Sequence, residues 1–388
     1  MGNVAFIPAR GGSKSIPGKN IANMCGRPMI HWALSAAERC PEIDRVYVST
    51  DNGAIREAAL SFQSGKVRVV ERDAALCGDD SPTDAAFVSF AREMEFSAAA
   101  LIQPTSPLVT SADISRGMAL MASGRDSCLS VVRQKRFMWE DRPEGAVPVN
   151  YAPADRPARQ VFPGQLVENG AFYITTREAL LRTGCRVSGR IGLVEMPPDT
   201  YVEVDEPADF TVAELLLSHR KPFAGRLARI KALLADCDGT LTDGGIYFAN
   251  DGDFMKKFHA HDGMAALMLA EAGFVTGVVT GAESGIVARR AERLAFSEVW
   301  QGVSDKLAVT REIAARRGLS LDEIAFIGDD LNDYAAMRAV GFSACPCDAV
   351  PEIARIADYV CKSPGGYGAY RELADLLIDA KSFYTSPE

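Results

Sequence analysis

The sequence predicts an α/β protein made of two doubly wound domains, and three observations support this. The chain has 388 residues, which exceeds the length at which a single hydrophobic core usually stops growing. Short apolar runs alternate with amphipathic stretches of helical period in both halves of the chain. A basic stretch with Pro and Gly, residues 219–226, interrupts the alternation and is typical of a linker.

The first half of the chain shows a regular succession of elements. Buried strands are predicted at residues 4–8, 45–49, 67–70, 98–102 and 127–132. Helices are predicted between them at residues 31–39, 55–61, 83–95 and 111–121. Strands at 172–175 and 191–196 and a helix at 207–217 follow. Such alternation favours a mostly parallel sheet with helices on both faces.

Residues 133–170 depart from this pattern, because they are rich in Pro, Arg and Gly and show little periodicity. A long irregular insertion of this kind indicates a binding loop or an oligomer arm. A second alternation then begins, with strands predicted at 231–235, 275–279 and 323–327 and helices at 263–272, 284–294 and 306–317. We therefore expect a first domain at 1–220, a linker at 221–228, a second domain at 229–381 and a tail at 382–388.

Composition excludes several classes of function. Apolar residues make up 47% of the chain and charged residues 24%, which is an ordinary globular balance. The formal net charge of −9 argues against a nucleic-acid partner. No apolar run is long enough for a membrane span, and the first residues lack the pattern of a secretion signal. Scattered cysteines without metal-site spacing agree with a reduced, cytoplasmic protein.

The first candidate site is the loop at residues 10–20, directly after the first predicted strand. It contains three cations and three glycines at the carboxyl end of that strand, where open α/β sheets bind their ligands. Glycines let the backbone approach phosphate oxygens, and backbone N–H groups can hold them. Neither the Walker A spacing nor G-x-G-x-x-G is present. The loop therefore predicts phosphate binding of another type.

A series of motifs in the first domain carries a family resemblance. In order they are Pro8-Ala9-Arg10-Gly11-Gly12-Ser13-Lys14, Pro17-Gly18-Lys19-Asn20, Ser49-Thr50-Asp51, Asp80-Ser81-Pro82-Thr83, Gln103-Pro104-Thr105-Ser106-Pro107-Leu108, Arg159-Gln160 and Asn169-Gly170-Ala171. Residues 1–218 thereby resemble CMP-sialic acid synthetases, the N-acylneuraminate cytidylyltransferases. The resemblance implies a Rossmann-like nucleotidyltransferase that couples a nonulosonic acid, an N-acylneuraminate or its deaminated form, to CMP.

The same resemblance implies roles for the matched residues. Those expected to hold CTP are Arg10, Ser13, Lys14, Lys19 and Asn20. Arg10 and Lys19 would also act in catalysis, by binding the triphosphate. Ser81 and Thr105 would contact the cytidine part, and Gln103 would lie between nucleotide and sugar. Arg159 and Gln160, in the irregular insertion, would face the sugar and its carboxylate.

An acidic pair, Glu203 and Asp205, lies near the end of the first domain. Alternation on a strand would direct both carboxylates to one side. The family binds Mg²⁺ through a comparable pair of aspartates, which makes Asp205 the safer ligand and Glu203 a second candidate. In the implied reaction the anomeric hydroxyl attacks the α-phosphorus of CTP and pyrophosphate leaves. This reaction requires the protein to align the two substrates and to neutralise charge, more than it requires covalent catalysis.

The second domain opens with a different constellation. Asp236 and Asp238 follow an apolar strand and precede a Gly turn, which suits nucleophilic attack on phosphorus with an adjacent acid/base. Thr280 follows the next strand, Lys306 begins a helix, and Gly328-Asp329-Asp330-Leu331-Asn332-Asp333 follows a third strand. These four features, in this order, resemble the haloacid dehalogenase (HAD) superfamily. The resemblance implies a C-terminal HAD-like Rossmannoid phosphatase domain.

The HAD resemblance also implies individual roles. Asp236 would be the nucleophile and Asp238 the general acid/base. Thr280 and Lys306 would hold the transferring phosphoryl group. The implied Mg²⁺ ligands are Asp236, Asp238 and Asp329, with support from Asp330 or Asp333.

The segment between Asp243 and Thr280 has room only for a hairpin and a helix, as in capless phosphatases of the octulosonate 8-phosphate and nonulosonate 9-phosphate type, which assemble as tetramers. His261 stands where octulosonate phosphatases tend to carry Arg, which favours a nine-carbon substrate. We expect a homotetramer with one Mg²⁺ in each domain. Two alternatives remain open: CMP-octulosonate synthesis with an octulosonate 8-phosphate phosphatase, and a synthetase whose HAD domain only mediates tetramerisation.

Overall fold

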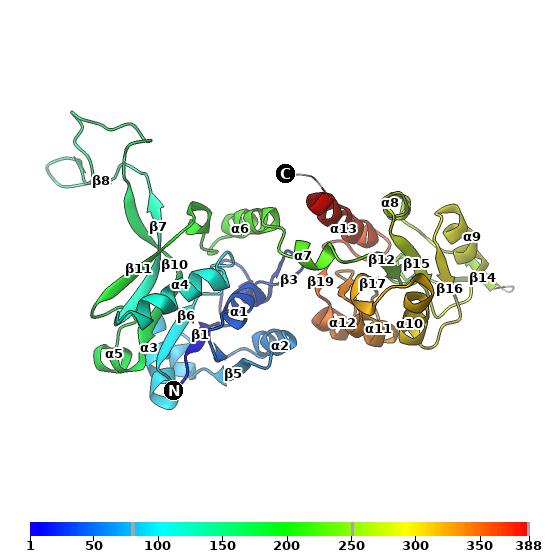
Figure 1. Ribbon diagram of the computed structural model, residues 1–388, viewed down its shortest axis with the longest axis horizontal. Coiled ribbons are helices and arrows are strands. Elements are labelled where there is room, and N and C mark those ends of the chain that lie inside the picture. The colour runs from blue at the N-terminus through cyan, green and yellow to red at the C-terminus, as the bar shows by residue number, and fades with distance from the viewer. Residues whose placement is uncertain (79–81, 250–251, 386–388) are drawn as a thin grey trace. The chain divides into compact units, whose positions relative to one another are not determined.

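A computed structural model describes residues 1–78, 82–249 and 252–385, and the chain divides into two compact units (Figure 1). The first unit comprises Met1–Ala22 and Pro28–Leu217. The second comprises Asn23–Arg27 and Ser218–Glu388. Each unit is built around its own sheet.

The first unit contains a seven-stranded sheet in the order β11-β7-β10-β6-β1-β4-β5. β10 is antiparallel to both of its neighbours, β6 and β7, whereas the other pairs are parallel. The strands are β1 (Val4–Pro8), β4 (Arg45–Thr50), β5 (Val67–Glu71), β6 (Ala98–Ile102), β7 (Ser127–Gln134), β10 (Gln165–Thr176) and β11 (Ile191–Met196).

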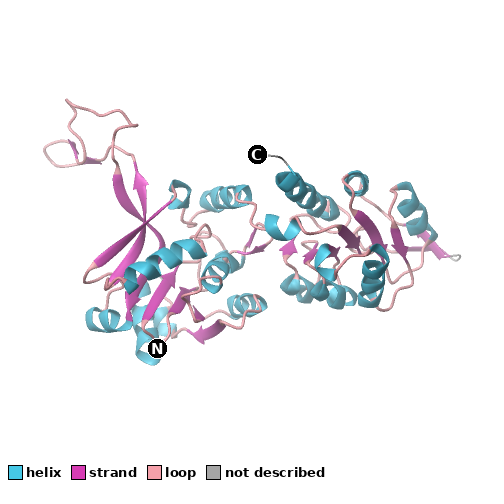
Figure 2. Ribbon diagram, viewed as in Figure 1, coloured by secondary structure: helices cyan, strands magenta, loops and turns pink. Residues whose placement is uncertain are grey.

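Helices cover both faces of this sheet, as Figure 2 shows. The alternation of β1 divides the core: Ala5 and Ile7 pack into one apolar cluster, and Val4 and Phe6 into another. The helices are α1 (Ile30–Glu38), α2 (Gly53–Ser61), α3 (Thr83–Glu93), α4 (Ser111–Ala122), α5 (Arg177–Thr183) and α6 (Pro207–His219). Residues of α1, α2 and α4 belong to the first cluster, and those of α3 and α5 to the second. The doubly wound prediction is therefore confirmed for this unit.

The insertion after β7 is more ordered than its composition indicates. It forms a hairpin of β8 (Trp139–Glu140) and β9 (Val147–Pro148), which projects beyond the sheet in Figure 1. Within the insertion, the Phe137 ring packs against the rings of Tyr151 and Phe162. β10 begins at Gln165, well before the predicted start at residue 172, because its first residues pair with the extended end of β7.

The second unit has a six-stranded sheet in the order β16-β15-β12-β17-β18-β19, with all strands parallel. Its strands are β12 (Ala232–Ala235), β15 (Val275–Val279), β16 (Glu298–Trp300), β17 (Ile324–Ile327), β18 (Phe342–Cys345) and β19 (Tyr359–Val360). A separate antiparallel hairpin joins β13 (Tyr247–Ala249) to β14 (Gly252–Met255). The parallel order confirms the second doubly wound α/β domain.

The helices of the second unit are α7 (Ala224–Leu227), α8 (Ala260–Glu271), α9 (Gly285–Arg293), α10 (Lys306–Arg317), α11 (Tyr334–Ala339), α12 (Pro351–Ile356) and α13 (Ala369–Thr385). Two of them lie at the predicted boundaries of the second domain. α7 forms a helical turn within the predicted linker, and α13 continues to Thr385, beyond the predicted start of the tail. α13 packs along α8, so its apolar face has a partner that the local sequence does not reveal.

Across the part of the chain that the structure describes, no helix combines the length and the apolar character needed to cross a bilayer.

Candidate active sites

The first site is a cleft of about 590 Å³ at the carboxyl end of β1, within the size range of small-molecule sites. It brings together nine of the residues that the sequence analysis singled out. They are Arg10, Ser13, Lys14, Lys19, Asn20, Gln103, Thr105, Glu203 and Asp205.

Hydrogen bonds fold the loop after β1 around this cleft. The backbone N–H of Gly11 donates to Asp51 Oδ1 at 3.0 Å, and the Asn20 amide donates to the carbonyl of Arg10 at 3.1 Å. Gly18 has a φ of 64°, in the left-handed region that favours glycine, and it precedes the 3₁₀ turn η1 (Lys19–Ile21). Arg10 Nη1 donates to the carbonyl of Gly78 at 3.1 Å. The cations are thus presented on a shaped backbone.

The acidic pair faces the basic loop across the cleft. Lys19 Nζ lies 3.2 Å from Asp205 Oδ1 and 2.8 Å from the carbonyl of Val204. Glu203 Oε1 accepts from Thr105 Oγ1 at 3.1 Å. Burial, together with the charge of Asp205, raises the pKa of Glu203. The predicted strand for this pair is wrong: 202–205 is an irregular segment before α6, although buried Val204 still separates two carboxylates that both reach the cleft.

One cleft residue, Arg72, was missed by the sequence analysis. Its side chain is buried, and its Nε has no hydrogen-bond partner within the described residues. Burial lowers the pKa of the Arg72 guanidinium. A buried cation with an unmet donor fits an anionic or carbonyl-bearing ligand. Its only sequence signal is a cation one residue after an apolar strand.

Two predicted residues do not line the cleft, and a third falls outside the described residues. Ser81 lies outside the described residues. Arg159 and Gln160 lie in the insertion and do not line the cleft; the carbonyl of Gln160 accepts from Lys135 Nζ at 3.3 Å.

The second site lies at the carboxyl ends of three adjacent strands in the second unit. Asp236 directly follows β12, Thr280 directly follows β15, and Asp329 follows β17 by one glycine. Because parallel strands end at the same edge of the sheet, these residues are drawn together by the topology. Ligand oxygens of Asp236, Asp329 and Asp333 all lie within 4.8 Å of one another.

Lys306 pairs with two carboxylates of this cluster. Its Nζ lies 2.7 Å from Asp236 Oδ1 and 2.6 Å from Asp333 Oδ1, and its side chain is buried. Burial disfavours the ammonium, but the two carboxylates outweigh this, so the pKa of Lys306 is raised. Asp333 Oδ2 also accepts from the N–H groups of Asp329 and Asp330. Asp333, not Asp330, therefore completes the cluster.

The acids of this cluster are held in an unfavourable environment. Burial, together with the charge of Asp333, raises the pKa of Asp236 to about 6. Burial and the charge of Asp236 raise the pKa of Asp329 to about 7. Burial likewise raises the pKa of Asp333. Buried carboxylates that repel one another are the arrangement that a divalent cation stabilises.

Asp238 has a partner that the sequence analysis did not assign. Lys256 Nζ lies 2.5 Å from Asp238 Oδ1, and the Lys256 side chain is only 3% exposed. Lys256 directly follows the β13–β14 hairpin. Phe258 forms a bridge with Thr242 in the turn at residues 236–244 after β12, which carries the candidate catalytic residues Asp236 and Asp238 and is named the catalytic turn. The side chain of Asp238 is not part of the three-carboxylate group found within the described residues.

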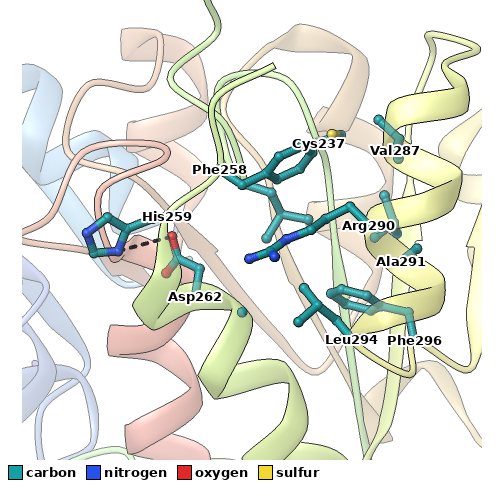
Figure 3. Close-up of a pocket in the computed structure, with 12 residues that line it drawn as sticks. Cys237, Phe258, His259, Asp262, Val287, Arg290, Ala291, Leu294 and Phe296 are labelled. Atoms are coloured by element: carbon teal, nitrogen blue, oxygen red, sulfur yellow. Dashed lines mark ion pairs between the residues drawn. The ribbon is translucent and has the colours of Figure 1, made fainter. Parts of the chain in front are cut away.

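A second, mostly apolar pocket lies behind the catalytic turn (Figure 3). Phe258 and Cys237 form one wall, and α9 presents Val287, Arg290 and Ala291 on the other. The Arg290 guanidinium lies 5.6 Å from the centre of the Phe258 ring. This packing supports the segment that carries Lys256.

Comparison with known proteins finds a family match in each of the two units. Residues 4–132 match the cytidylyltransferase family model, and residues 293–373 match the haloacid dehalogenase-like hydrolase model. The chain is similar to N-acylneuraminate cytidylyltransferase B of Danio rerio, with 33% identity over 97% of this chain and 90% of the relative. It is also similar to N-acylneuraminate cytidylyltransferase of Oncorhynchus mykiss, with 32% identity over 96% of this chain and 88% of the relative.

A second set of relatives covers the later part of the chain. The 3-deoxy-D-manno-octulosonate 8-phosphate phosphatase of Yersinia pestis is 36% identical over 40% of this chain and 83% of the relative. The crystal structure of the Moraxella catarrhalis phosphatase of the same name, in complex with a magnesium ion, a phosphate ion and a KDO molecule, is 32% identical. It covers 43% of this chain and 95% of its own, with a TM-score of 0.41.

Proposed function

Because the chain belongs to the family of N-acylneuraminate cytidylyltransferases, we propose that its first unit transfers CMP from CTP to the anomeric hydroxyl of a nonulosonic acid, releasing pyrophosphate. The observation that carries this proposal is the cleft in which the basic loop faces Glu203 and Asp205. An N-acylneuraminate or its deaminated form would be the acceptor sugar.

In this proposal the chain's own residues align CTP and neutralise its charge. Arg10, Lys14 and Lys19 bind the triphosphate, with Arg10 able to grip two oxygens at once. Ser13 and Asn20 complete the nucleotide contacts, and Thr105 and Ser81 bind the cytidine part. Gln103, Arg159 and Gln160 would recognise the sugar, the last two from the insertion.

A Mg²⁺ ion fits the acidic side of the cleft. Nucleotide-bound Mg²⁺ commonly uses only one or two protein carboxylates, and Asp205 and Glu203 both reach this cleft. Burial raises the pKa of Glu203, which means that the ionised carboxylate is disfavoured. A bound cation would stabilise that ionised form. The ion would neutralise phosphate charge and polarise the α-phosphoryl group.

For the second unit we propose hydrolysis of the 9-phosphate of the same type of sugar acid. The observation that carries this proposal is the cluster of Asp236, Asp329 and Asp333, in which Lys306 pairs with Asp236 and Asp333. Asp236 attacks phosphorus and forms an aspartyl-phosphate, while Asp238 protonates the leaving sugar oxygen and then activates water. Lys306 and Thr280 bind the transferring phosphoryl group.

The three clustered carboxylates also fit a second Mg²⁺ ion. Their oxygens lie within 4.8 Å of one another, and oxygen ligands are the ones this ion prefers. We propose Asp236 and Asp329 as side-chain ligands, Asp238 through its backbone carbonyl, and Asp333 as support. The ion would offset the mutual repulsion of the acids and the charge of the phosphoryl group.

One observation favours a second candidate for the phosphatase unit. Its similarity to octulosonate 8-phosphate phosphatases makes an eight-carbon sugar-acid phosphate an alternative substrate. The third reading, an inert tetramerisation module, conflicts with the cluster, since buried convergent acids are unfavourable without a cation to bind.

We further propose a cytoplasmic homotetramer. No disulfide bond is formed by the nine cysteines, all of which lie within the described residues, as is usual in a reducing compartment. The insertion carries exposed Trp139 and Val161, which suit a dimer interface, and the capless phosphatase unit would supply a second interface.

Two assays on the purified full-length chain test these proposals. Free nonulosonic acids and octulosonate are each supplied with CTP, and pyrophosphate release is followed. The nine-carbon 9-phosphate and the eight-carbon 8-phosphate are then supplied alone, and phosphate release is followed. We expect turnover of the nine-carbon compounds in both assays. Preference for the eight-carbon compounds would establish the alternative, and absence of phosphate release would leave only the synthetase.

A further inference from the structure

An ammonium and an aromatic ring lie together beside the phosphatase site, and the proposed mechanism uses neither. Lys257 Nζ lies 3.6 Å from the centre of the Tyr367 ring and 3.1 Å from Asp243 Oδ2. The Lys257 side chain is 44% exposed and Tyr367 is 50% exposed. Both groups are therefore accessible to a bound molecule within this unit, whereas Lys256 next to them is buried against Asp238.

The loop that carries Tyr367 is fixed directly on the catalytic turn of its own chain. The backbone N–H of Gly366 donates to the carbonyl of Thr240 at 2.9 Å. A Cβ at Gly365 would lie 1.8 Å from the carbonyl oxygen of Gly239, so only glycine permits this approach. Tyr367 is consequently held close to Asp238, which lies two positions before Thr240 in the chain.

The start of α8 carries two histidines, His259 and His261, and His259 lies near Tyr367. The rings of His259 and His261 are 4.9 Å apart, and the His259 ring is 6.4 Å from that of Tyr367. Asp262 fixes this arrangement, because it accepts from the backbone N–H of Gly368 at 3.2 Å. Figure 3 shows His259 and Asp262 side by side at this helix start. His261 is exposed and Lys257 precedes it by four residues.

The burial of the phosphate-binding residues determines the direction in which a bound sugar phosphate lies. Its phosphoryl group belongs beside Asp236 and Lys306, which are buried. The remainder of the molecule must extend toward the exposed rim. A second negative charge on the substrate would there meet Lys257, whose ammonium has three donors and contacts Asp243 and Tyr367. The Tyr367 ring offers an apolar face and a hydroxyl to a polyol chain.

We propose that Lys257, Tyr367 and His261 form the subsite that binds the carboxylate end of a sugar-acid phosphate. This inference rests on the phosphatase activity proposed above and adds the residues that select its substrate. Lys257 binds the carboxylate, Tyr367 fixes the Lys257 ammonium and contacts the carbon chain, and His261 supplies a further hydrogen-bond donor. The subsite selects phosphate esters of sugar acids over esters without a carboxylate.

The test compares two substrates on the full-length protein with Mg²⁺. One is the nonulosonic acid 9-phosphate, and the other is p-nitrophenyl phosphate, which has no carboxylate. Lys257→Met should lower kcat/KM for the sugar-acid phosphate about 10- to 100-fold, mainly through KM, as expected for a lost charged hydrogen bond. Its kcat/KM for p-nitrophenyl phosphate should change less than about twofold, which also reports an intact fold. Lys257→Arg should restore much of the loss.

Lys231→Met is the matched control. Lys231 is an exposed lysine in an ion pair with Glu323, just before the start of β12, whereas Asp236 follows the end of that strand. Tyr367→Leu provides a second variant and should raise KM for the sugar-acid phosphate alone. The 9-phosphate of the sugar's C1 methyl ester should be hydrolysed equally by wild type and Lys257→Met.

The outcomes separate the two levels of the proposal. If wild type hydrolyses the sugar-acid phosphate but Lys257→Met and Tyr367→Leu keep its KM, the subsite is overturned and the phosphatase stands. Equal losses on both substrates would also overturn it. If wild type hydrolyses neither substrate, the phosphatase assignment itself fails, and the subsite with it.

Discussion

The ammonium of Lys256 lies 2.5 Å from the carboxylate of Asp238. Asp238 lies in the turn after β12, and Lys256 follows β14 of the same unit. The buried lysine restricts Asp238 to one orientation. The proposed acid/base therefore owes its position to a residue 18 positions further along the chain.

Removal of this partner should impair the phosphatase by misplacing its acid/base. Lys256→Met keeps the apolar stem but removes the charge. We expect kcat for sugar 9-phosphate hydrolysis to fall about 10- to 100-fold, within the range of a general acid–base contribution. Phosphate release under saturating substrate measures this. Lys231→Met again serves as control, and an unchanged kcat for Lys256→Met would show that Asp238 does not depend on this ion pair.

A substitution in the loop at residues 10–20 should affect CMP transfer and not phosphate release. Lys19→Ala removes a cation that faces the cleft and its ion pair with Asp205. We expect CMP transfer to fall about 100- to 1,000-fold, comparable to the loss of one transition-state donor. Phosphate release from the 9-phosphate should be unaffected, because its residues belong to the other unit. A folded Lys19→Ala protein that loses both activities equally would contradict separate sites.

Removal of the metal should lower the free energy of unfolding, because the carboxylates of the acidic cluster then repel one another. In the folded, metal-free protein burial raises the pKa of Asp236 to about 6 and that of Asp329 to about 7, above the value of about 3.9 for an unfolded Asp. The folded state then binds more protons than the unfolded state between these pH values. Its free energy of unfolding therefore falls as pH rises through this window.

Asp329→Asn supplies the comparison for this effect. With EDTA present, wild type should lose Tm relative to Asp329→Asn as pH rises from about 4 to about 7. Added Mg²⁺ should raise the wild-type Tm, and more at the higher pH, because protons compete for the ligands. Parallel pH profiles of the two proteins would exclude a raised pKa at Asp329.

Assembly should depend on the insertion. Trp139 is 54% exposed on the β8–β9 hairpin, and a charge there should weaken an apolar interface. Light scattering should give a tetramer for wild type and a smaller species for Trp139→Glu. Leu60→Glu is the control, because Leu60 is 56% exposed on α2. A monomeric wild type at micromolar concentration would refute the proposed assembly.

Sequence reasoning worked where a short motif follows a buried strand. The strand that ends before Asp236 and the strand that ends before Asp329 both exist, and the topology brings the two acids together. The loop after β1 likewise reaches the cleft with its cations. In these cases a local pattern suffices, because parallel strands end at a common edge.

The sequence did not predict which residues meet when they lie far apart in the chain. Arg72 lies in no motif, and only the fold directs it to the nucleotide cleft. The pairing of Lys256 with Asp238 depends on how the β13–β14 hairpin lies on the catalytic turn. β10 was predicted too short, because its first half looks irregular until the extended end of β7 pairs with it. Tertiary contacts decide each of these positions.

The central claim is that one chain removes a phosphate from a sugar acid and then attaches CMP to it. The most direct measurement supplies nonulosonic acid 9-phosphate and CTP together to wild type and to Asp236→Asn. Wild type should form the CMP-sugar. Asp236→Asn cannot form the aspartyl-phosphate, so its phosphate release should fall at least about 1,000-fold, and it should make the CMP-sugar only when free sugar acid is added. If Asp236→Asn still hydrolyses the 9-phosphate at the wild-type rate, Asp236 is not the nucleophile and the account of the second unit is wrong.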